Sequence, residues 1–187
     1  MEIAFEEIES EFEQTFRYVK QDIAKILEKD LRLHYTIALL ACCACEMLAW
    51  HQDSTEDEVF TSLLPDSYKA VGKTLLDALR NGLAHNFRPK TIKFGNEKWR
   101  LSIYSEQGGP FLKVLEDEEE QQQRWIVLNV RTLSSRIFSL IDAYEERLRT
   151  SADARLNFEQ KSERSIKSIS AEATRLAEAF RSLPQEA

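Results

Sequence analysis

The longest apolar stretch of the chain covers residues 35–50 and reads YTIALLACCACEMLAW, interrupted by the charged residue Glu46. A membrane-spanning helix needs about 20 predominantly apolar residues, so this stretch is too short to be one. Apolar side chains would lie on every side of such a helix, which is typical of the buried centre of a bundle. We therefore expect a mainly α protein without a membrane segment, built around a helix over residues 31–51.

Four more helices are predicted around this central one. In residues 1–29 the apolar residues recur at steps of three and four, which places them on one stripe of a helix. Together with the central helix, the predicted helices cover residues 1–29, 31–51, 66–87, 130–149 and 152–182. The polar residues 52–58 are expected to form a loop, and Asp66 is expected to be the N-cap of the third helix.

The last predicted helix has apolar residues at the spacing of a coiled-coil seam. They are Ile166, Ile169, Ala173, Leu176, Phe180 and Leu183, at alternating steps of three and four. Such a seam is built to lie along another helix. It favours a homodimer, although a seam of this length can also be buried within one chain.

The helical pattern is interrupted between about residues 90 and 130. Residues 91–94 and 99–104 are rich in β-branched and aromatic residues, and Gly95 and Asn96 lie between them, as in a β-hairpin. Residues 111–115 and 125–130 are candidates for two further strands. The sequence thus predicts one domain over residues 1–187, a helical bundle with a small antiparallel β insertion.

Composition restricts the class of protein. The chain has 187 residues and a formal net charge of -7, which argues against a protein that coats DNA. Its start is acidic, unlike a signal peptide. The cysteines, Cys42, Cys43 and Cys45, are odd in number and clustered, which favours reduced thiols in a cytoplasmic protein. On one helix they cannot surround a metal ion, so we expect no metal and no cofactor. His34 and His51 are expected at the surface.

The candidate chemistry lies in residues 79–87, which read LRNGLAHNF. Asn81 and His85 are four residues apart, so on a helix Asn81 could hydrogen-bond the imidazole and fix its tautomer. Arg80 and His85 diverge by about 140° on an ideal helix. The length of the arginine compensates in part, and a second chain across a two-fold axis would compensate fully.

Arginine and histidine suit phosphoryl transfer on RNA without a metal. Histidine titrates near neutrality and can move a proton, and arginine offers a planar fork of donors to a phosphate. Residues 80–100 contain six Lys or Arg residues and one acidic residue, Glu97. Basic residues interleaved with aromatic ones suit single-stranded RNA. The predicted RNA-binding residues are Arg88, Lys90, Lys93, Lys98, Trp99 and Arg100.

Arg-x4-His, with a polar residue directly after the arginine at the end of a third helix, resembles the motif of the HEPN superfamily. Many HEPN domains are metal-independent endoribonucleases of toxin–antitoxin, abortive-infection or CRISPR-linked defence systems. The resemblance implies a HEPN-like bundle, a dimer with a composite site and products with cyclic phosphate ends. It also implies an antitoxin or regulatory protein as a possible partner. By this resemblance Arg80 and His85 are the catalytic pair and Asn81 is accessory.

Several alternatives remain at the level of the sequence. His85 could satisfy carbonyl groups at its own helix end, and Arg80 could form a salt bridge to Asp77 or to another helix. Glu46 could be the buried partner of an arginine or tyrosine, or it could orient Arg80 or His85 within the catalytic site. Phe87 stands where HEPN toxins inhibited by nucleotidylation often have a tyrosine. The alternative functions are a non-catalytic module that binds nucleotide, RNA or a protein partner, and a structural dimer.

Overall fold

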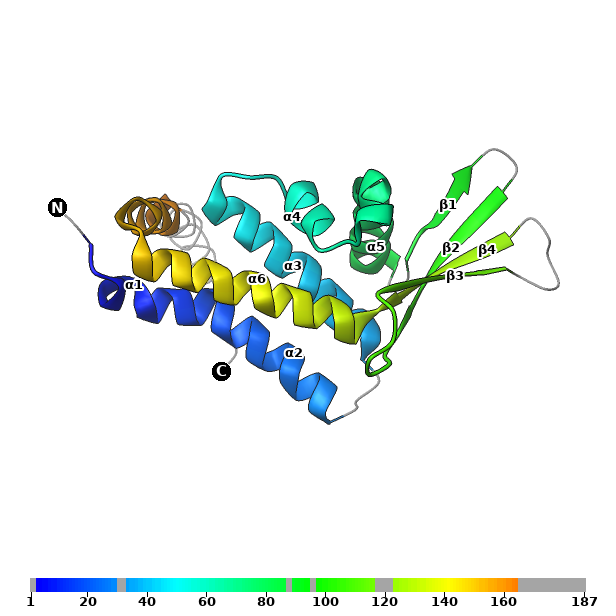
Figure 1. The fold of residues 1–187 in the computed structure, drawn as a ribbon, viewed down its shortest axis with the longest axis horizontal. Helices are drawn as coiled ribbons and strands as arrows, with labels where there is room; N and C mark the ends of the chain where they lie inside the picture. The colour runs from blue at the N-terminus through cyan, green and yellow to red at the C-terminus, as the bar shows by residue number, and fades with distance from the viewer. Residues whose placement is uncertain (1–2, 30–32, 87–88, 95–96, 117–122, 165–187) are drawn as a thin grey trace, which may run out of the picture.

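A computed structural model describes residues 3–29, 33–86, 89–94, 97–116 and 123–164. The protein is mostly helical, with a four-stranded sheet that projects from one end of the bundle (Figure 1). The helical elements are α1 (Phe5–Phe12), η1 (Glu13–Arg17), α2 (Tyr18–Glu28), α3 (His34–Gln52), α4 (Glu56–Ser62), η2 (Asp66–Val71), α5 (Gly72–Asn86), α6 (Val130–Thr150) and a helix over residues 152–164. The strands are β1 (Thr91–Phe94), β2 (Glu97–Tyr104), β3 (Leu112–Glu116) and β4 (Gln123–Asn129).

The central helix is α3, as the apolar stretch predicts. It contacts α2, α4, α5, α6 and strand β2. Cys42 and Cys45 are buried in it, whereas Cys43 is exposed. The first predicted helix is also present, as α1 and α2 joined by the π-helical segment η1, and its apolar stripe is buried against the bundle. The period of apolar residues thus identified both helices correctly.

The connection between α3 and α5 differs from the prediction. The expected loop over residues 52–58 is present only at residues 53–55, because helix α4 begins at Glu56; its N-cap Thr55 accepts a hydrogen bond from the backbone of Glu58 in a capping box. Asp66 is not an N-cap: it begins the 3-10 helix η2, where it forms an ion pair with Lys69 at 2.7 Å. Helix α5 therefore begins only at Gly72.

The β insertion is mixed, which corrects the predicted antiparallel sheet. The strand order is β1-β2-β4-β3, and β2 pairs with β4 in parallel. The β1–β2 hairpin and the β3–β4 pair are antiparallel. The reason is that β4 returns between β2 and β3, so that β3 becomes an edge strand. Buried Asn129 at the end of β4 holds this arrangement, because its side chain bonds the backbone of Glu106 and the carbonyl of Gly109.

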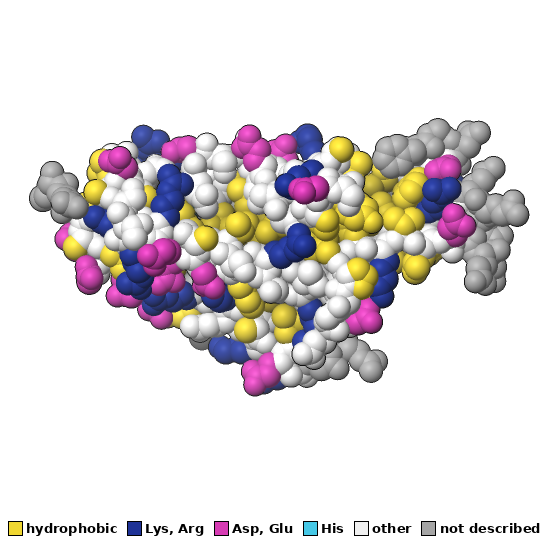
Figure 2. All heavy atoms as spheres, in the orientation of Figure 1, with side chains coloured by type: hydrophobic (Ala, Val, Ile, Leu, Met, Phe, Trp, Pro, Cys, Tyr) yellow, Lys and Arg dark blue, Asp and Glu magenta, His cyan; other side chains and the backbone are white. Residues whose placement is uncertain are grey.

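The two faces of the sheet differ in character. Tyr68, Val71, Ile92, Trp99 and Ile126 are among the residues that line an apolar groove of about 400 Å³ between one face and α5 with η2. Figure 2 shows hydrophobic side chains gathered beside the upper right end of the bundle. The opposite face bears the basic residues described below. In the described segments no helix is long and apolar enough to cross a membrane.

The helix over residues 152–164 covers the end of α3. Its Phe158 is fully buried and stacks on His51, with ring centroids 4.6 Å apart. The prediction that His51 lies at the surface is therefore wrong, because this helix and the ring of Phe16 enclose it. The predicted seam from Ile166 to Leu183 lies outside the described residues.

The buried His51 predicts a loss of stability in mild acid. Burial, and to a lesser extent the charge of Lys161, lowers the pKa of His51 from 6.5 to about 4. Between these two pH values the unfolded chain binds a proton at this histidine and the folded chain does not, so stability falls as the pH decreases from about 6.5 to about 4. A pKa difference of this size corresponds to about 3 kcal/mol.

Urea unfolding at pH 7 and pH 4.5 measures this effect, with His51→Gln as the control that cannot titrate. Between pH 7 and pH 4.5 we expect the free energy of unfolding to fall by about 2–3 kcal/mol more in the wild type than in the control. Equal losses of unfolding free energy in the two proteins would contradict the conclusion that the buried His51 causes the acid sensitivity.

Candidate functional site

Two carboxylates from two other helices contact Arg80, and we call these three side chains the Arg80 cluster. Arg80 of α5 donates from Nη2 to Oε2 of Glu46 of α3 at 3.0 Å, and from Nη1 to Glu56 of α4. The exposed fractions of the side chains are 42% for Arg80, 57% for Glu46 and 14% for Glu56. The contact between Glu46 and Arg80 agrees with the sequence, but Glu46 is exposed rather than buried. Arg80 is neither sealed in the core nor without a partner.

Glu56 was not predicted from the sequence as a site residue. Its Oε1 is buried and has no hydrogen-bond partner among the described residues. Burial raises the pKa of Glu56, whereas the charge of Arg80 lowers it. A signal was present in the sequence, because Thr55-x-x-Glu58 is a capping box that predicts a helix at this position. That helix brings Glu56 to Arg80.

Cys42, which lies beside this cluster, is not a candidate nucleophile. Burial and, secondarily, the charge of Glu56 raise the pKa of Cys42 to about 12. The thiol is therefore protonated at neutral pH, and a thiol is a poor nucleophile compared with a thiolate.

The remaining residues of the motif follow Arg80 along α5. This helix continues to Asn86, so Arg80, Asn81 and His85 lie on one helix as predicted. Asn81 is half-buried, and Gly82 is buried. The side chain of His85 lies outside the described residues.

Basic residues gather on one face of the sheet. The register pairs Lys93 with Lys98 and Thr91 with Arg100, which places all four side chains on the same face, and we call it the basic face. Lys93, Lys98 and Arg100 are exposed, and within the described part of the chain none of them forms an ion pair. Like charges directly opposite each other destabilise a strand pair, and a bound anion would relieve this repulsion.

The sheet does not bring all of the predicted RNA-binding residues together. Trp99 lies on the apolar face, where its Nε1 donates to Glu97 at 3.0 Å and Arg124 stacks over its ring at 5.2 Å. Lys90 is exposed beside β1, whereas Arg88 lies outside the described residues. One aromatic residue of the basic face is Trp125, which the sequence does not single out as an RNA-binding residue. The parallel pairing of β2 with β4 sets it opposite Arg100, whose guanidinium lies 5.4 Å from the centre of the Trp125 ring.

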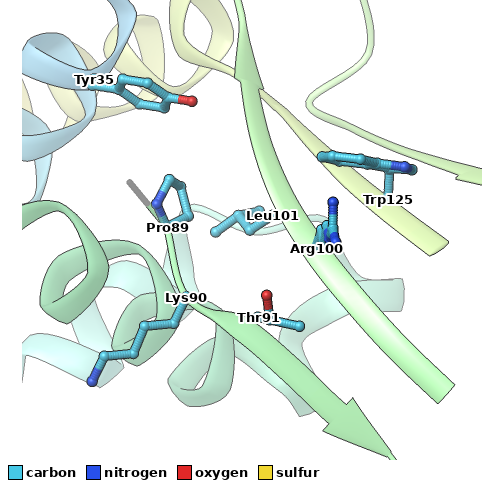
Figure 3. Close-up of a pocket in the computed structure, with 7 residues that line it drawn as sticks. All are labelled: Tyr35, Pro89, Lys90, Thr91, Arg100, Leu101 and Trp125. Atoms are coloured by element: carbon cyan, nitrogen blue, oxygen red, sulfur yellow. The ribbon is translucent and has the colours of Figure 1, made fainter. Parts of the chain in front are cut away.

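A pocket of about 540 Å³ lies where the basic face meets the start of α3, and we call it the Tyr35 pocket (Figure 3). Its walls come from Tyr35, from residues 89–91, and from Arg100, Leu101 and Trp125. The backbone N–H of Lys90 donates to the carbonyl of Ala78 at 2.9 Å, which fixes this wall against α5. The same helix thus contains Arg80 and adjoins the pocket.

Within the described ranges, no group of three or more His, Cys, Asp and Glu side chains is placed to hold a metal ion. Comparisons with family models, curated proteins and solved structures found no match to this chain. The features of this chain that indicate a function are therefore the motif of α5, the Arg80 cluster and the basic face.

Proposed function

We propose that this protein binds single-stranded RNA on its basic face and cleaves it as a metal-independent, HEPN-like endoribonuclease. One observation supports this proposal above the others: three exposed cations without an ion-pair partner among the described residues lie on a sheet that is joined directly to the helix of Arg80 and His85. RNA phosphates are the natural ligands of such a surface. The chain that leaves α5 enters β1, so bound RNA would lie near the end of that helix.

The chemistry assigned to the motif needs three roles. His85 moves the proton of the 2′-hydroxyl or of the leaving group, Arg80 stabilises the charge that builds on the phosphate, and Asn81 orients the imidazole. A guanidinium has five N–H donors, and the Arg80 cluster uses two of them. The others are available to a phosphate, while Glu46 and Glu56 act as positioning residues.

We further propose that the active form is a homodimer. Arg80 and His85 diverge by about 140° around α5, and a second copy of the motif across a two-fold axis would supply the missing group. Sedimentation at tens of micromolar tests this point, and a monomer that cleaves RNA would contradict it.

The first test is incubation of the purified protein with total RNA in EDTA. We expect endonucleolytic fragments from single-stranded regions, because no metal takes part in the mechanism. Cleavage that disappears in EDTA would contradict the proposal.

A specific observation favours a second candidate, a non-catalytic RNA-binding module. The two carboxylates on Arg80 compensate its charge, and a compensated arginine attracts a phosphate less strongly than a free one. This candidate predicts binding of single-stranded RNA without any cleavage, so the same incubation distinguishes the two functions.

Removal of one lysine from the basic face should weaken RNA binding for all sequences alike. For Lys93→Ala or Lys98→Ala we expect the salt dependence of the binding constant to become shallower by about 0.7 units of slope on a log–log plot, the value for one phosphate contact to a single strand. Fluorescence anisotropy with a labelled oligonucleotide at several salt concentrations measures this slope. Lys25→Ala, which removes an exposed lysine from α2, is the matched control and should leave the slope unchanged.

A further inference from the structure

The Tyr35 pocket combines an aromatic ring and a cation on opposite sides of one hollow. The ring of Tyr35 extends from α3 toward the gap, and Arg100 and Trp125 lie across it on the sheet (Figure 3). The Thr91 hydroxyl points into the pocket, whereas the Lys90 side chain extends away from it. Arg100 is thus the cation of the pocket.

Each wall matches one part of a nucleotide. The side chain of Tyr35 is 46% exposed, so one of its faces can receive a nucleobase. Arg100 offers guanidinium donors to a phosphate, and its position over the Trp125 ring fixes its direction. The volume of about 540 Å³ lies within the range of small-molecule pockets, about 300–1,000 Å³.

We propose that the Tyr35 pocket is a base-stacking subsite that holds one nucleotide of single-stranded RNA, with its base against Tyr35 and its phosphate against Arg100. This inference depends on the RNA binding proposed above and adds a contact that the motif of α5 does not imply. All four bases stack on aromatic rings, so the subsite binds RNA without selecting one base.

The subsite lies away from the cleavage centre. Tyr35 and Glu46 are both on α3, eleven residues apart, which corresponds to about 16 Å along the helix. The nucleotide in the pocket is therefore separated from the scissile phosphate near the Arg80 cluster. It would hold the strand in place without taking part in the chemistry.

The test uses octaadenylate, AMP and ribose 5-phosphate as probes, with Tyr35→Ala, Tyr35→Phe and Tyr18→Ala as variants. Tyr18 is the matched control because it is a helical tyrosine with 51% exposure that does not line the Tyr35 pocket. We expect Tyr35→Ala to weaken octaadenylate and AMP binding about 5- to 150-fold, the range of base–aromatic stacking. Tyr35→Phe should keep the affinity, and ribose 5-phosphate, which has no base, should bind all variants alike.

The outcomes separate this inference from the proposed function. If octaadenylate binds and Lys93→Ala weakens it, but Tyr35→Ala changes nothing, the subsite is wrong and the RNA-binding face stands. If AMP binding depends on Tyr35 and octaadenylate does not bind, the pocket holds a free nucleotide against Tyr35, and both its role as a subsite for RNA and the proposed RNA function are wrong. If neither probe binds, both are overturned.

Discussion

His85→Ala should reduce the rate of RNA cleavage about 10²- to 10⁴-fold, the usual contribution of a general acid or base. The imidazole moves the proton that an alanine methyl group cannot move. The measurement is the rate of cleavage of a labelled single-stranded oligonucleotide in EDTA, at saturating protein. RNA affinity should change little, because the cations of the basic face remain.

The matched control is His34→Ala, which removes a half-buried histidine from the first turn of α3. This variant should cleave at the wild-type rate. A His85→Ala protein that retains full activity would contradict the assignment of the proton-transferring group.

Arg80→Ala should reduce both cleavage and stability. Loss of a donor to the transition-state charge costs about 10²- to 10³-fold in rate. The stability loss arises because Glu56, which is only 14% exposed, is left without its cation. We expect the free energy of unfolding to fall by about 1–3 kcal/mol. This is less than the roughly 3–5 kcal/mol lost when one partner of a fully buried pair is removed, because Arg80 itself is partly exposed.

The stability of the Arg80→Ala variant should depend on pH because of the Glu56 carboxyl group. Burial already raises the pKa of Glu56, and loss of Arg80 raises it further. An unpaired Glu56 keeps its proton in the folded state at pH values where the unfolded chain has already lost it, so the destabilisation should grow as the pH rises from the ordinary pKa of the carboxyl group to its raised folded-state pKa, and stay constant above that. Urea unfolding at pH 5 and pH 8 measures this difference.

The double variant Arg80→Ala with Glu56→Gln separates the two effects. Glutamine removes the unpaired charge, so we expect most of the stability to return while cleavage stays low. Recovery of cleavage together with stability would show that Arg80 serves the fold alone.

Much of the bundle is predictable from the sequence because its helices have clear apolar patterns. The all-apolar centre of α3 predicts a buried helix, and the stripe from Phe5 to Ile26 predicts a helix and its buried side. The mixed sheet was not predictable, since the return of β4 between β2 and β3 depends on the buried contacts of Asn129. His51 was misplaced because the helix of Phe158 covers it, which is a tertiary effect.

The candidate site was only partly predictable for similar reasons. The ion pair of Arg80 with Glu46 follows from their helices being neighbours, and the basic face follows from the alternation of residues in β1 and β2. The sequence does not point to Glu56, because the polar residues 52–58 around it predict a loop. Trp125 was missed because only the parallel register brings it to Arg100.

The most direct test of the central claim compares an RNA oligonucleotide with its fully 2′-O-methylated counterpart in EDTA. A 2′-hydroxyl is the nucleophile in the proposed reaction, so blocking it removes the chemistry and leaves the phosphates for binding. We predict cleavage of the RNA, with cyclic phosphate ends, and binding without cleavage of the methylated strand. Cleavage of both strands, or of neither while both bind tightly, would contradict the account.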